Sequence, residues 1–496
     1  MNSAKPLFFA ALLVIIALSG LLLFKGSDRA QSSNEELELH CAAGLRIPIT
    51  EIVERYQEEY GITIRTHFAG SGELASQLEV AGGDLYLPAD ISYIETTQSK
   101  GLVKEAIPAA YLTAGIAVAK GNPKSIRSLA DLGREDVRVS LANPSAAIGK
   151  FTKKVLSGIN QWEAIEANAT VFKFTVNDIA QDVSTGSADA TIVWDAVAGM
   201  FDNLEFVHVP EFDQRRKTAT IGVLTESKHP TMALRFARYL TASDRGLENF
   251  QKHGFQVVEG DPWELHPELT FFSGSMLRPA IEQQLRLFEE REGVRIIPEY
   301  EGCGILVSMM EAGAEPDAYF SCDLQFLDRV QDRFEKGTIV TKNDMILLVA
   351  KGNPKKIGTL NDLLRDGLKV GLAHPQKSAL GKLTLDLLEK RGLYEKLNAT
   401  GNLSVLASKG DELANQMQIG ALDGAIIYRS NALSSEQIFE QCEMIDIAND
   451  AQAVQPFAVA RKSSHKQLAR RLEKFLTGAA GKEQFLKYGF HWELTP

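Results

Sequence analysis

Alternating apolar and polar positions divide the chain into short strands and helices. Between residues 48 and 61, five apolar side chains recur at helical spacing before Gly61, a residue type that commonly ends helices. The segments LELHCAA (37–43) and ITIRTHFA (62–69) predict strands, and a second helix is predicted over 70–82. The five side chains that mark the first helix are Ile49, Ile52, Val53, Tyr56 and Tyr60.

The same series of segments occurs twice along the chain. The offset between matching segments stays between 231 and 235 residues, and a chance similarity would lose register over such a distance. The chain is therefore a tandem duplication. The matching pairs include HCAAGLR (40–46) with FSGSMLR (272–278), AKGNPK (119–124) with AKGNPK (350–355), ANPSAAIGK (142–150) with AHPQKSALGK (373–382), ATIVW (190–194) with GAIIY (424–428), and HGF (253–255) with YGF (488–490).

This duplication predicts the domain organisation. A first domain is expected over 37–262 and a second over 268–496, with a joint in the segment EGDPWELHPE (259–268). Each copy alternates strands with helices, which predicts an α/β fold built on a mostly parallel sheet with helices on both faces. Ligands of such sheets bind at the carboxyl ends of the strands, so the turns where a strand passes into a helix are the candidate site.

Three such turns recur in both copies and pair small residues with the start of a predicted helix. They are AAGLR with GSMLR, AGSGEL with EGCGIL, and SAAIGK with KSALGK. Small residues let a ligand approach the backbone, and the N–H groups of a first helical turn can donate to an anion. Ordinary helix caps and glycine turns explain any single one of them. Three turns repeated in two copies favour a bound oxyanion.

Composition and charge narrow the class of ligand and the location. The formal net charge of -11 over 496 residues argues against a nucleic-acid partner, because phosphate backbones are bound by clustered Lys and Arg. An uncharged run of 18 residues at 7–24 predicts an uncleaved membrane anchor or a cleaved signal, so the rest of the chain is expected outside the cytoplasm. We favour an inner-membrane anchor and tether over 1–36 and a periplasmic location.

The order of these motifs resembles that of the periplasmic molybdate/tungstate-binding proteins, the solute-binding components of ABC transporters. The resemblance covers both copies and implies, for each, two α/β lobes joined by a hinge and closing over one tetrahedral oxyanion (the type 2 periplasmic-binding fold). The lobe crossings are expected near residues 112 and 198 and, in the second copy, near 343 and 432. The resemblance further implies ABC permease and ATPase partners, no cofactor and no enzymatic activity.

The resemblance also carries ligand-binding roles to positions in both copies. In the first copy Ser71 keeps the family's hydroxyl, Gly44 stands where a serine is usual, and Trp194 stands where a tyrosine is usual. The first-copy candidates are Gly44, Ser71, Gly72, Ile148, Gly149, Ile179 (or its neighbour Asp178) and Trp194. The second-copy candidates are Ser275, Met276, Cys303, Gly304, Leu380, Gly381 and Tyr428.

The cysteines of the second copy leave alternatives open. Cys303 takes the place of Ser71, and Cys322 takes the place of Ala89. The two thiols are expected to be small buried residues or a structural disulfide, a metal or soft-ligand pair, or, with Cys303 as nucleophile, part of a thiol enzyme. For the whole chain the alternatives to transport are a membrane-tethered ligand sensor or interaction module, and binding of a metal or an organic anion in the second cleft.

Overall fold

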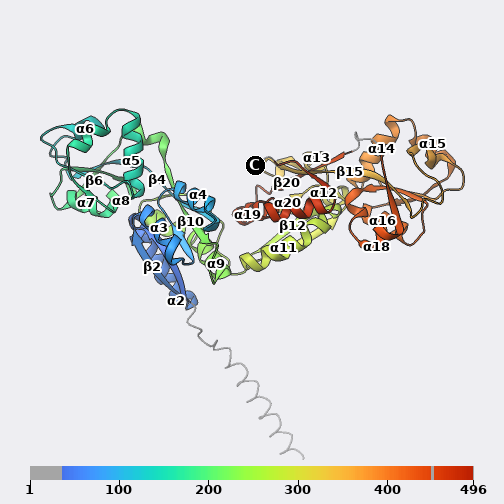
Figure 1. Ribbon diagram of the computed structural model, residues 1–496, viewed down its shortest axis with the longest axis horizontal. Helices are drawn as coiled ribbons and strands as arrows, with labels where there is room; N and C mark the ends of the chain where they lie inside the picture. Colours follow the sequence, from blue (N-terminus) through green and yellow to red (C-terminus); the bar gives the residue numbers. More distant parts are fainter. Residues whose placement is uncertain (1–35, 448–451, 495–496) are drawn as a thin grey trace, which may run out of the picture. The chain divides into compact units, whose positions relative to one another are not determined.

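The computed structural model describes residues 36–447 and 452–494. They form two compact units, which Figure 1 shows with their helices and strands labelled. The first unit comprises residues up to 229 together with 249–257, and the second comprises 230–248 together with 258 onward. The proposed domain boundaries of 37–262 and 268–496 differ from these units chiefly in 230–248, which contains the helix α9 (Pro230–Leu240).

The first unit contains two sheets, each with its own helices. The first lobe is built on the sheet β11-β4-β10-β3-β1-β2, and the second lobe is built on β7-β6-β8-β5-β9. The first lobe consists of β1 (Glu36–Ala42), η1 (Ala43–Leu45), α2 (Arg46–Tyr60), β2 (Thr63–Ala69), α3 (Ser71–Ala81), β3 (Leu85–Leu87), α4 (Ile91–Ser99), β4 (Val103–Leu112), β10 (Lys217–Leu224) and β11 (Gln256–Val257). The second lobe consists of β5 (Ala114–Ala119), η2 (Leu129–Gly133), β6 (Val139–Ala142), α5 (Ala147–Gly158), α6 (Trp162–Ala167), β7 (Ala169–Lys173), α7 (Val176–Ser184), β8 (Ala190–Trp194), α8 (Asp195–Gly199), β9 (Leu204–Val207) and η3 (Pro210–Arg215).

The second unit repeats this order of elements along one connected series of strands. The long strand β15 takes part in both lobes, and the series runs β13-β12-β14-β20-β15-β18-β16-β17. The first lobe consists of β12 (Glu268–Gly274), η4 (Ser275–Leu277), α11 (Arg278–Glu292), β13 (Arg295–Glu301), α12 (Cys303–Glu311), β14 (Ala318–Phe320), α13 (Leu324–Asp328), η5 (Gln331–Arg333), β15 (Thr338–Ala350), β20 (Gln452–Val459), α19 (Lys466–Leu476), α20 (Ala479–Lys487) and β21 (Phe490–Trp492). The second lobe consists of η6 (Leu360–Leu364), β16 (Val370–Ala373), α14 (Ala379–Lys390), α15 (Tyr394–Thr400), β17 (Leu403–Ala407), α16 (Gly410–Gln418), β18 (Gly424–Tyr428), α17 (Arg429–Ala432), α18 (Glu436–Gln441) and β19 (Cys442–Asp446).

The predicted first helix and its counterpart form as their periodicity indicates. Helix α2 ends at Gly61, whose φ of 69° lies in the left-handed region, and α11 ends at Gly293, whose φ is 66°. Four of the five marked side chains on α2 are buried, and Tyr60 is half-buried. Each fully buried apolar side chain stabilises the fold by about 1.5–3 kcal/mol, which is why one face of each helix fixes its position on the sheet.

The sheets are mixed rather than mostly parallel. In the first lobe of the first unit β1 pairs in parallel with β2 and β3, but β10 pairs antiparallel with both β3 and β4. In the second lobe β6 pairs in parallel with β7 and β8, whereas β5 is antiparallel to its neighbours. The antiparallel strands β4, β5 and β10 are those next to the passages between the lobes, and local periodicity does not show their direction.

The crossings between the lobes are partly where the sequence places them. The chain passes from the first sheet to the second at Thr113, between β4 and β5, as expected near residue 112. It returns between β9 and β10, at residues 208–216, so the expectation of a crossing near 198 is wrong. Residue 198 lies in α8, which packs beside β9 in the second lobe.

The joint segment is an ordered part of the second unit. Asp261 accepts hydrogen bonds from the backbone N–H groups of Gln467 and Leu468, both at 2.9 Å, at the start of α19. Such a carboxylate satisfies first-turn donors that have no acceptor within the helix. No helix within the described ranges has the length and apolar character needed to cross a bilayer. The apolar run 7–24, which predicts an anchor, lies outside the described residues.

Candidate ligand-binding site

A small cavity lies between the two lobes of the first unit. Its lining comes from the carboxyl ends of β1, β2 and β3 in the first lobe and of β6, β7 and β8 in the second, together with the turns that follow them. Its volume is about 20 Å³, and none of its lining side chains carries a charge. The lining residues are Ala42, Ala43, Gly44, Ala69, Gly70, Ser71, Ala89, Ala146, Ala147, Ile148, Thr175, Val176 and Trp194.

Three helices begin at this cavity. The N-cap positions of α3 and α5 are Gly70 and Ala146, and neither makes a side-chain capping bond. The first-turn N–H groups of a helix have no intrahelical acceptor and carry partial positive charge. The third helix, α7, begins after Thr175. This arrangement suits an anion held mainly by backbone donors.

Two hydroxyl groups at the cavity keep a proton for a ligand. The Ser71 Oγ accepts a hydrogen bond from the N–H of Ala89 at 3.2 Å, and the Thr175 Oγ1 accepts one from the N–H of Asp178 at 3.2 Å. Because each oxygen acts as an acceptor in these bonds, its own O–H remains a donor. Ser71 belongs to the first lobe and Thr175 to the second, so each lobe supplies one hydroxyl.

Gly44 and Trp194 shape the wall of the cavity. A Cβ added at Gly44 would lie 2.8 Å from Val176 Cγ1 and 3.3 Å from Val197 Cγ2, so the second lobe fills the place of a side chain there. Trp194 is 1% exposed, and its ring packs against Phe151 with centroids 5.6 Å apart. The missing family serine is thus replaced by close packing between the lobes rather than by another polar group.

Four of the seven candidates in the first copy line this cavity, and three do not. Gly44, Ser71, Ile148 and Trp194 belong to the lining. The Gly72 N–H donates to Ser145 O at 2.9 Å across the two lobes, and Gly149 packs against the backbone of residues 142 and 143. Ile179 is fully buried in the core.

Among the lining residues that are not candidates in the sequence, Thr175 is the one with a polar side chain. It lies three residues before Asp178, in the pattern of a threonine N-cap, and its side chain accepts a hydrogen bond from the Asp178 N–H. That local signal was sufficient to place the start of α7 at Thr175 rather than at Ile179. The turn at the start of α7 therefore covers residues 175–178, which include Asp178, the alternative to Ile179.

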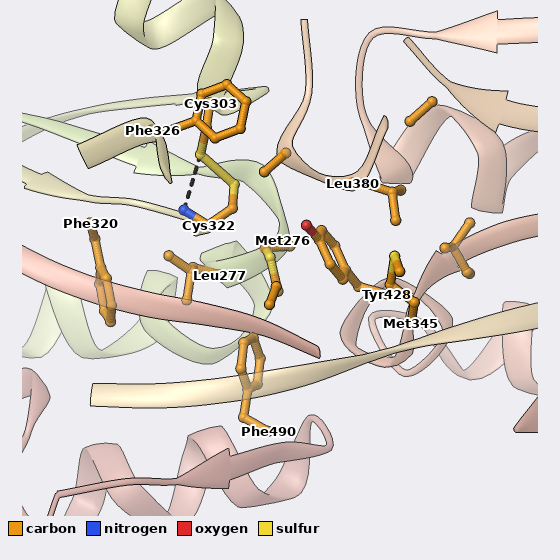
Figure 2. Close-up of a cluster of buried hydrophobic side chains, with 14 of the residues drawn as sticks. Met276, Leu277, Cys303, Phe320, Cys322, Phe326, Met345, Leu380, Tyr428 and Phe490 are labelled. Atoms are coloured by element: carbon orange, nitrogen blue, oxygen red, sulfur yellow. Dashed lines mark hydrogen bonds between the residues drawn. A yellow bond between two sulfur atoms is a disulfide. The ribbon is translucent and has the colours of Figure 1, made fainter. Parts of the chain in front are cut away.

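In the second unit Cys303 and Cys322 form a disulfide, which decides between the alternatives that the sequence leaves open. Figure 2 shows this disulfide and the hydrogen bond from the Cys322 N–H to Cys303 Sγ, at 3.0 Å. The same bond joins Ala89 to Ser71 in the first unit. Gly274, the counterpart of Ala42, leaves room for the sulfurs, because a Cβ there would lie 3.2 Å from Cys303 Sγ and closer still to Cys322 Sγ.

The other second-copy candidates surround the disulfide. Met276, Leu380 and Tyr428 are almost fully buried, and the Tyr428 hydroxyl points toward Met276 (Figure 2). That hydroxyl has no hydrogen-bond partner among the described residues, and burial raises the pKa of Tyr428 well above its ordinary value. Gly304 donates its N–H to Lys377 O at 3.1 Å, as Gly72 does to Ser145.

The remaining second-copy residues lie at equivalent places. Gly381 packs against the backbone of residues 373 and 374, as Gly149 does against its own neighbours. Ser275 lies beside Asp411 at the start of α16, close enough to affect the pKa of that carboxyl. Cys41 and Cys442 are free and buried. Within the described part of the chain, no group of three or more His, Cys, Asp and Glu side chains could hold a metal ion.

Comparisons with known proteins agree with this architecture. The sequence profile of the family described as bacterial extracellular solute-binding protein matches residues 37–256 and again residues 269–491. The molybdate-binding protein ModA of Mycobacterium tuberculosis is 32% identical over 219 residues, which are 43% of this chain and 82% of that protein. A sulfate-binding protein of Synechococcus elongatus is 23% identical over 253 residues, 45% of this chain and 72% of that protein.

Among solved structures, the periplasmic molybdate-binding protein of Azotobacter vinelandii matches 45% of this chain and 100% of its own, at 14% identity and a TM-score of 0.39. The two profile matches fall on the two copies found in the sequence. The tandem duplication is thereby confirmed, and the chain belongs, in both halves, to the family of bacterial extracellular solute-binding proteins, with molybdate-binding proteins among its relatives.

Proposed function

We propose that the first unit captures a tetrahedral oxyanion of the molybdate/tungstate class outside the cytoplasm and delivers it to an ABC permease and its ATPase. The observation that carries this proposal is the cavity of the first unit, whose lining has no charged side chain and receives two hydroxyl groups and the starts of three helices. An oxyanion presents acceptors in every direction, so donors that converge from two lobes match its chemistry.

The buried carboxylate of Asp90, next to the cavity, is paired with a lysine and so does not oppose an anionic ligand. Asp90 follows the lining residue Ala89 and is 2% exposed, but Lys217 pairs with its carboxylate at 2.9 Å. Asp90 also caps α4 by accepting the N–H of Ser92 at 2.9 Å. The buried carboxylate next to Ala89 is therefore neutralised by a cation in the same lobe, and it adds little repulsion toward an anionic ligand.

The size of the cavity implies movement of the lobes. A volume of about 20 Å³ accommodates about one water molecule. A five-atom oxyanion is larger, so the lobes must separate to admit it and then close on it. Separation and closure about the crossing strands is a hinge motion of the kind that many binding proteins use. Binding energy then comes from donors that meet only in the closed form.

A membrane-tethered sensor is the second candidate for the whole chain, because a tethered binding unit suits signalling as well as transport. The proposed location is periplasmic, with residues 7–24 as the anchor. The two roles separate when the intact chain is reconstituted with a candidate permease and ATPase in proteoliposomes. Uptake of radiolabelled molybdate supports transport, and binding without uptake supports the sensor.

The binding proposal is tested by isothermal titration of the intact chain with molybdate, tungstate, sulfate and phosphate, under reducing and non-reducing conditions. Submicromolar binding of molybdate or tungstate, with much weaker binding of sulfate and phosphate, is the expected result. Tighter binding of sulfate would transfer the assignment to the other oxyanion class represented among the relatives. Absence of heat with all four anions would reject the oxyanion assignment.

A further inference from the structure

The second cleft differs from the first in how its volume is filled. In the first unit Gly44 leaves room for Val176 and Val197. The corresponding residues of the second unit are Met276, Gly410 and Asn431. In the first unit the two valines come from the second lobe, whereas in the second unit the large apolar side chain, Met276, comes from the first lobe. Met276 is 1% exposed and lies between Leu277 and Tyr428 (Figure 2). The space that small residues leave in the first cleft is therefore occupied by a side chain in the second.

Polar side chains also join the two lobes of the second unit where the first unit has its cavity lining. Lys409 Nζ lies 3.1 Å from Glu301 Oε1, and this pair replaces the lining residues Thr175 and Ala69. The bridge connects the end of β13 in the first lobe to the start of α16 in the second. An ion pair thus spans the second cleft at positions where the first cleft presents a hydroxyl and a methyl group.

A carboxyl group stands in the second cleft where the first unit has an amide side chain. Asp411 accepts a hydrogen bond from Asn431 Nδ2 at 2.6 Å, and Ser275 of the opposite lobe lies close enough to its carboxyl to oppose the rise in pKa that burial causes. The first-unit counterparts are Asn177, whose Oδ1 is buried without a hydrogen-bond partner among the described residues, and Ala43. The second cleft thus holds a carboxyl group of its own, next to Ser275 of the opposite lobe.

The charge balance of the second cleft is unfavourable to a further anion. Asp323, the counterpart of Asp90, is 6% exposed and accepts the N–H groups of Gln325 and Val454, but no cation pairs with it among the described residues. Burial raises the pKa of both Asp323 and Asp411, and their hydrogen bonds only partly oppose that effect. An incoming oxyanion would meet the same cost of burial and the repulsion of two carboxyl groups.

The second cleft lacks a donor equivalent to the Ser71 hydroxyl, because Cys303 and Cys322 form a disulfide there. Cys303 Sγ keeps the hydrogen bond from the following loop but has no proton, because it is bonded to Cys322 Sγ. In the first unit the equivalent Ser71 retains its O–H. Of the side-chain donors that the resemblance implies, the second cleft keeps the Tyr428 hydroxyl, which is buried without a hydrogen-bond partner among the described residues.

From these observations we propose that the second cleft is a self-occupied site: its own side chains fill and bridge it, it stays closed without ligand, and the intact chain takes up one oxyanion, in the first cleft. The Glu301–Lys409 pair and the close approach of η4, which carries Ser275, to α16, which carries Asp411, are the contacts that hold the second pair of lobes together. The stoichiometry of one rests on the proposed function of the first unit, whereas closure of the second cleft does not.

In both units the lobes also touch at the rim, so the distinction lies inside the clefts. The first unit has the Gly72–Ser145 backbone bond, and Lys150 Nζ lies over the ring of Tyr93 at 4.5 Å. The second unit has the equivalent Gly304–Lys377 bond. The lobes of the first unit are also joined by the Tyr93 hydroxyl, which donates to Ser145 O at 3.5 Å, and by Lys150 Nζ, which donates to Ser92 Oγ at 3.5 Å. The Glu301–Lys409 pair, by contrast, has no counterpart in the first unit, where Ala69 and Thr175 occupy the same positions.

The test is hydrogen–deuterium exchange of the intact chain, with and without tungstate, followed by mass spectrometry of the peptides that contain the starts of α3, α5 and α7 and of α12, α14 and α16. Tungstate is expected to slow exchange in the first set and to leave the second set unchanged. Two variants restore first-unit residues in the second cleft, Lys409→Thr and Ser275→Ala. Each is expected to speed exchange at α12 and α16 at least several-fold, with or without tungstate.

Lys382→Ala is the matched control, because the ion pair of Lys382 with Asp386 stays within α14. It is expected to leave exchange at α12 and α16 unchanged. Tungstate-dependent protection of the second set, lost in Tyr428→Phe, would overturn the proposal by showing a second oxyanion site. Unchanged exchange at α12 and α16 in both bridge variants would also overturn it. If tungstate protects neither set, the function proposed for the first unit fails, while the bridge variants still decide whether the second cleft is held closed.

Discussion

Removal of the Ser71 hydroxyl tests the proposed oxyanion site most directly. Ser71 is 2% exposed, stands at the start of α3, and lines the cavity of the first unit. Its oxygen accepts the N–H of Ala89, and its proton is available to a ligand. The substitution Ser71→Ala therefore deletes one donor to the oxyanion and one acceptor for a backbone group, and the two losses appear in different measurements.

The magnitudes follow from the two roles. A hydrogen bond to a charged group contributes about 1.5–3 kcal/mol, so the Kd for tungstate should rise about 10–150-fold. The Ala89 N–H, left without its acceptor, should lower the free energy of unfolding of the first unit by about 1–3 kcal/mol. The bond from the Tyr86 hydroxyl to the backbone oxygen of Ser71, at 2.6 Å, is unaffected because that oxygen belongs to the main chain.

Isothermal titration with tungstate measures the first effect, and differential scanning calorimetry measures the second. Ser76→Ala is the matched control: Ser76 lies on the exposed side of the same helix, and its hydroxyl donates only to Gly72 O within that helix. If Ser71→Ala binds tungstate as tightly as the wild type, the hydroxyl does not contact the ligand, and the proposed placement of the oxyanion at the start of α3 is refuted.

Three further predictions concern packing, the disulfide and a helix cap. Gly44→Ala places a methyl group 2.8 Å from a valine of the opposite lobe, so overpacking should cost about 1–3 kcal/mol in the calorimeter and weaken tungstate binding. Reduction of Cys303–Cys322, which closes a loop with a sequence separation of 19, should lower the stability of the second unit by about 3 kcal/mol and leave tungstate binding unchanged in the titration. Ser128→Ala removes a capping box and should cost the first unit about 1 kcal/mol at neutral pH. The N–H of Arg127 lowers the pKa of Asp131 in that box, so this contribution is present above the ordinary value of 3.8 and disappears as the pH falls through the lowered one. Unfolding scans of the wild type and of Ser128→Ala at pH 7 and pH 3 measure how much of this stability difference remains at low pH.

Local sequence patterns were sufficient to predict the strands and helices of the first lobe that line the cavity. The strands and helices predicted over 37–82 form within a few residues of their expected ends, because each depends on a periodicity and on a stop signal that lie within one segment. The repeat also places the turns at Ser71 and Ile148 at the cavity without knowledge of the fold. The resemblance places a donating turn at Ile179 or Asp178. In the structure α7 begins after Thr175, so Asp178 lies in its first turn and Ile179 is buried in the core.

The second cleft shows what the repeat does not reveal. The exchange of Ser71 for Cys303 is visible in the sequence, but the disulfide depends on the distance between two turns that lie 19 residues apart. The approach of Asp411 to Ser275 joins residues more than one hundred positions apart and in different lobes. Neither contact leaves a local signal, because each arises only when both sheets are formed and the lobes have met.

The sequence by itself determined that the chain is a duplicated α/β protein, that its candidate sites lie where strands pass into helices, and that one serine changes to cysteine between the copies. Those features are encoded in spacing and register, which depend on neighbours along the chain. Only the tertiary structure decided that the first cleft leaves an uncharged cavity while the second is filled and bridged by its own side chains. Volume and charge in a cleft are sums over residues brought together from both lobes, so no single segment contains them.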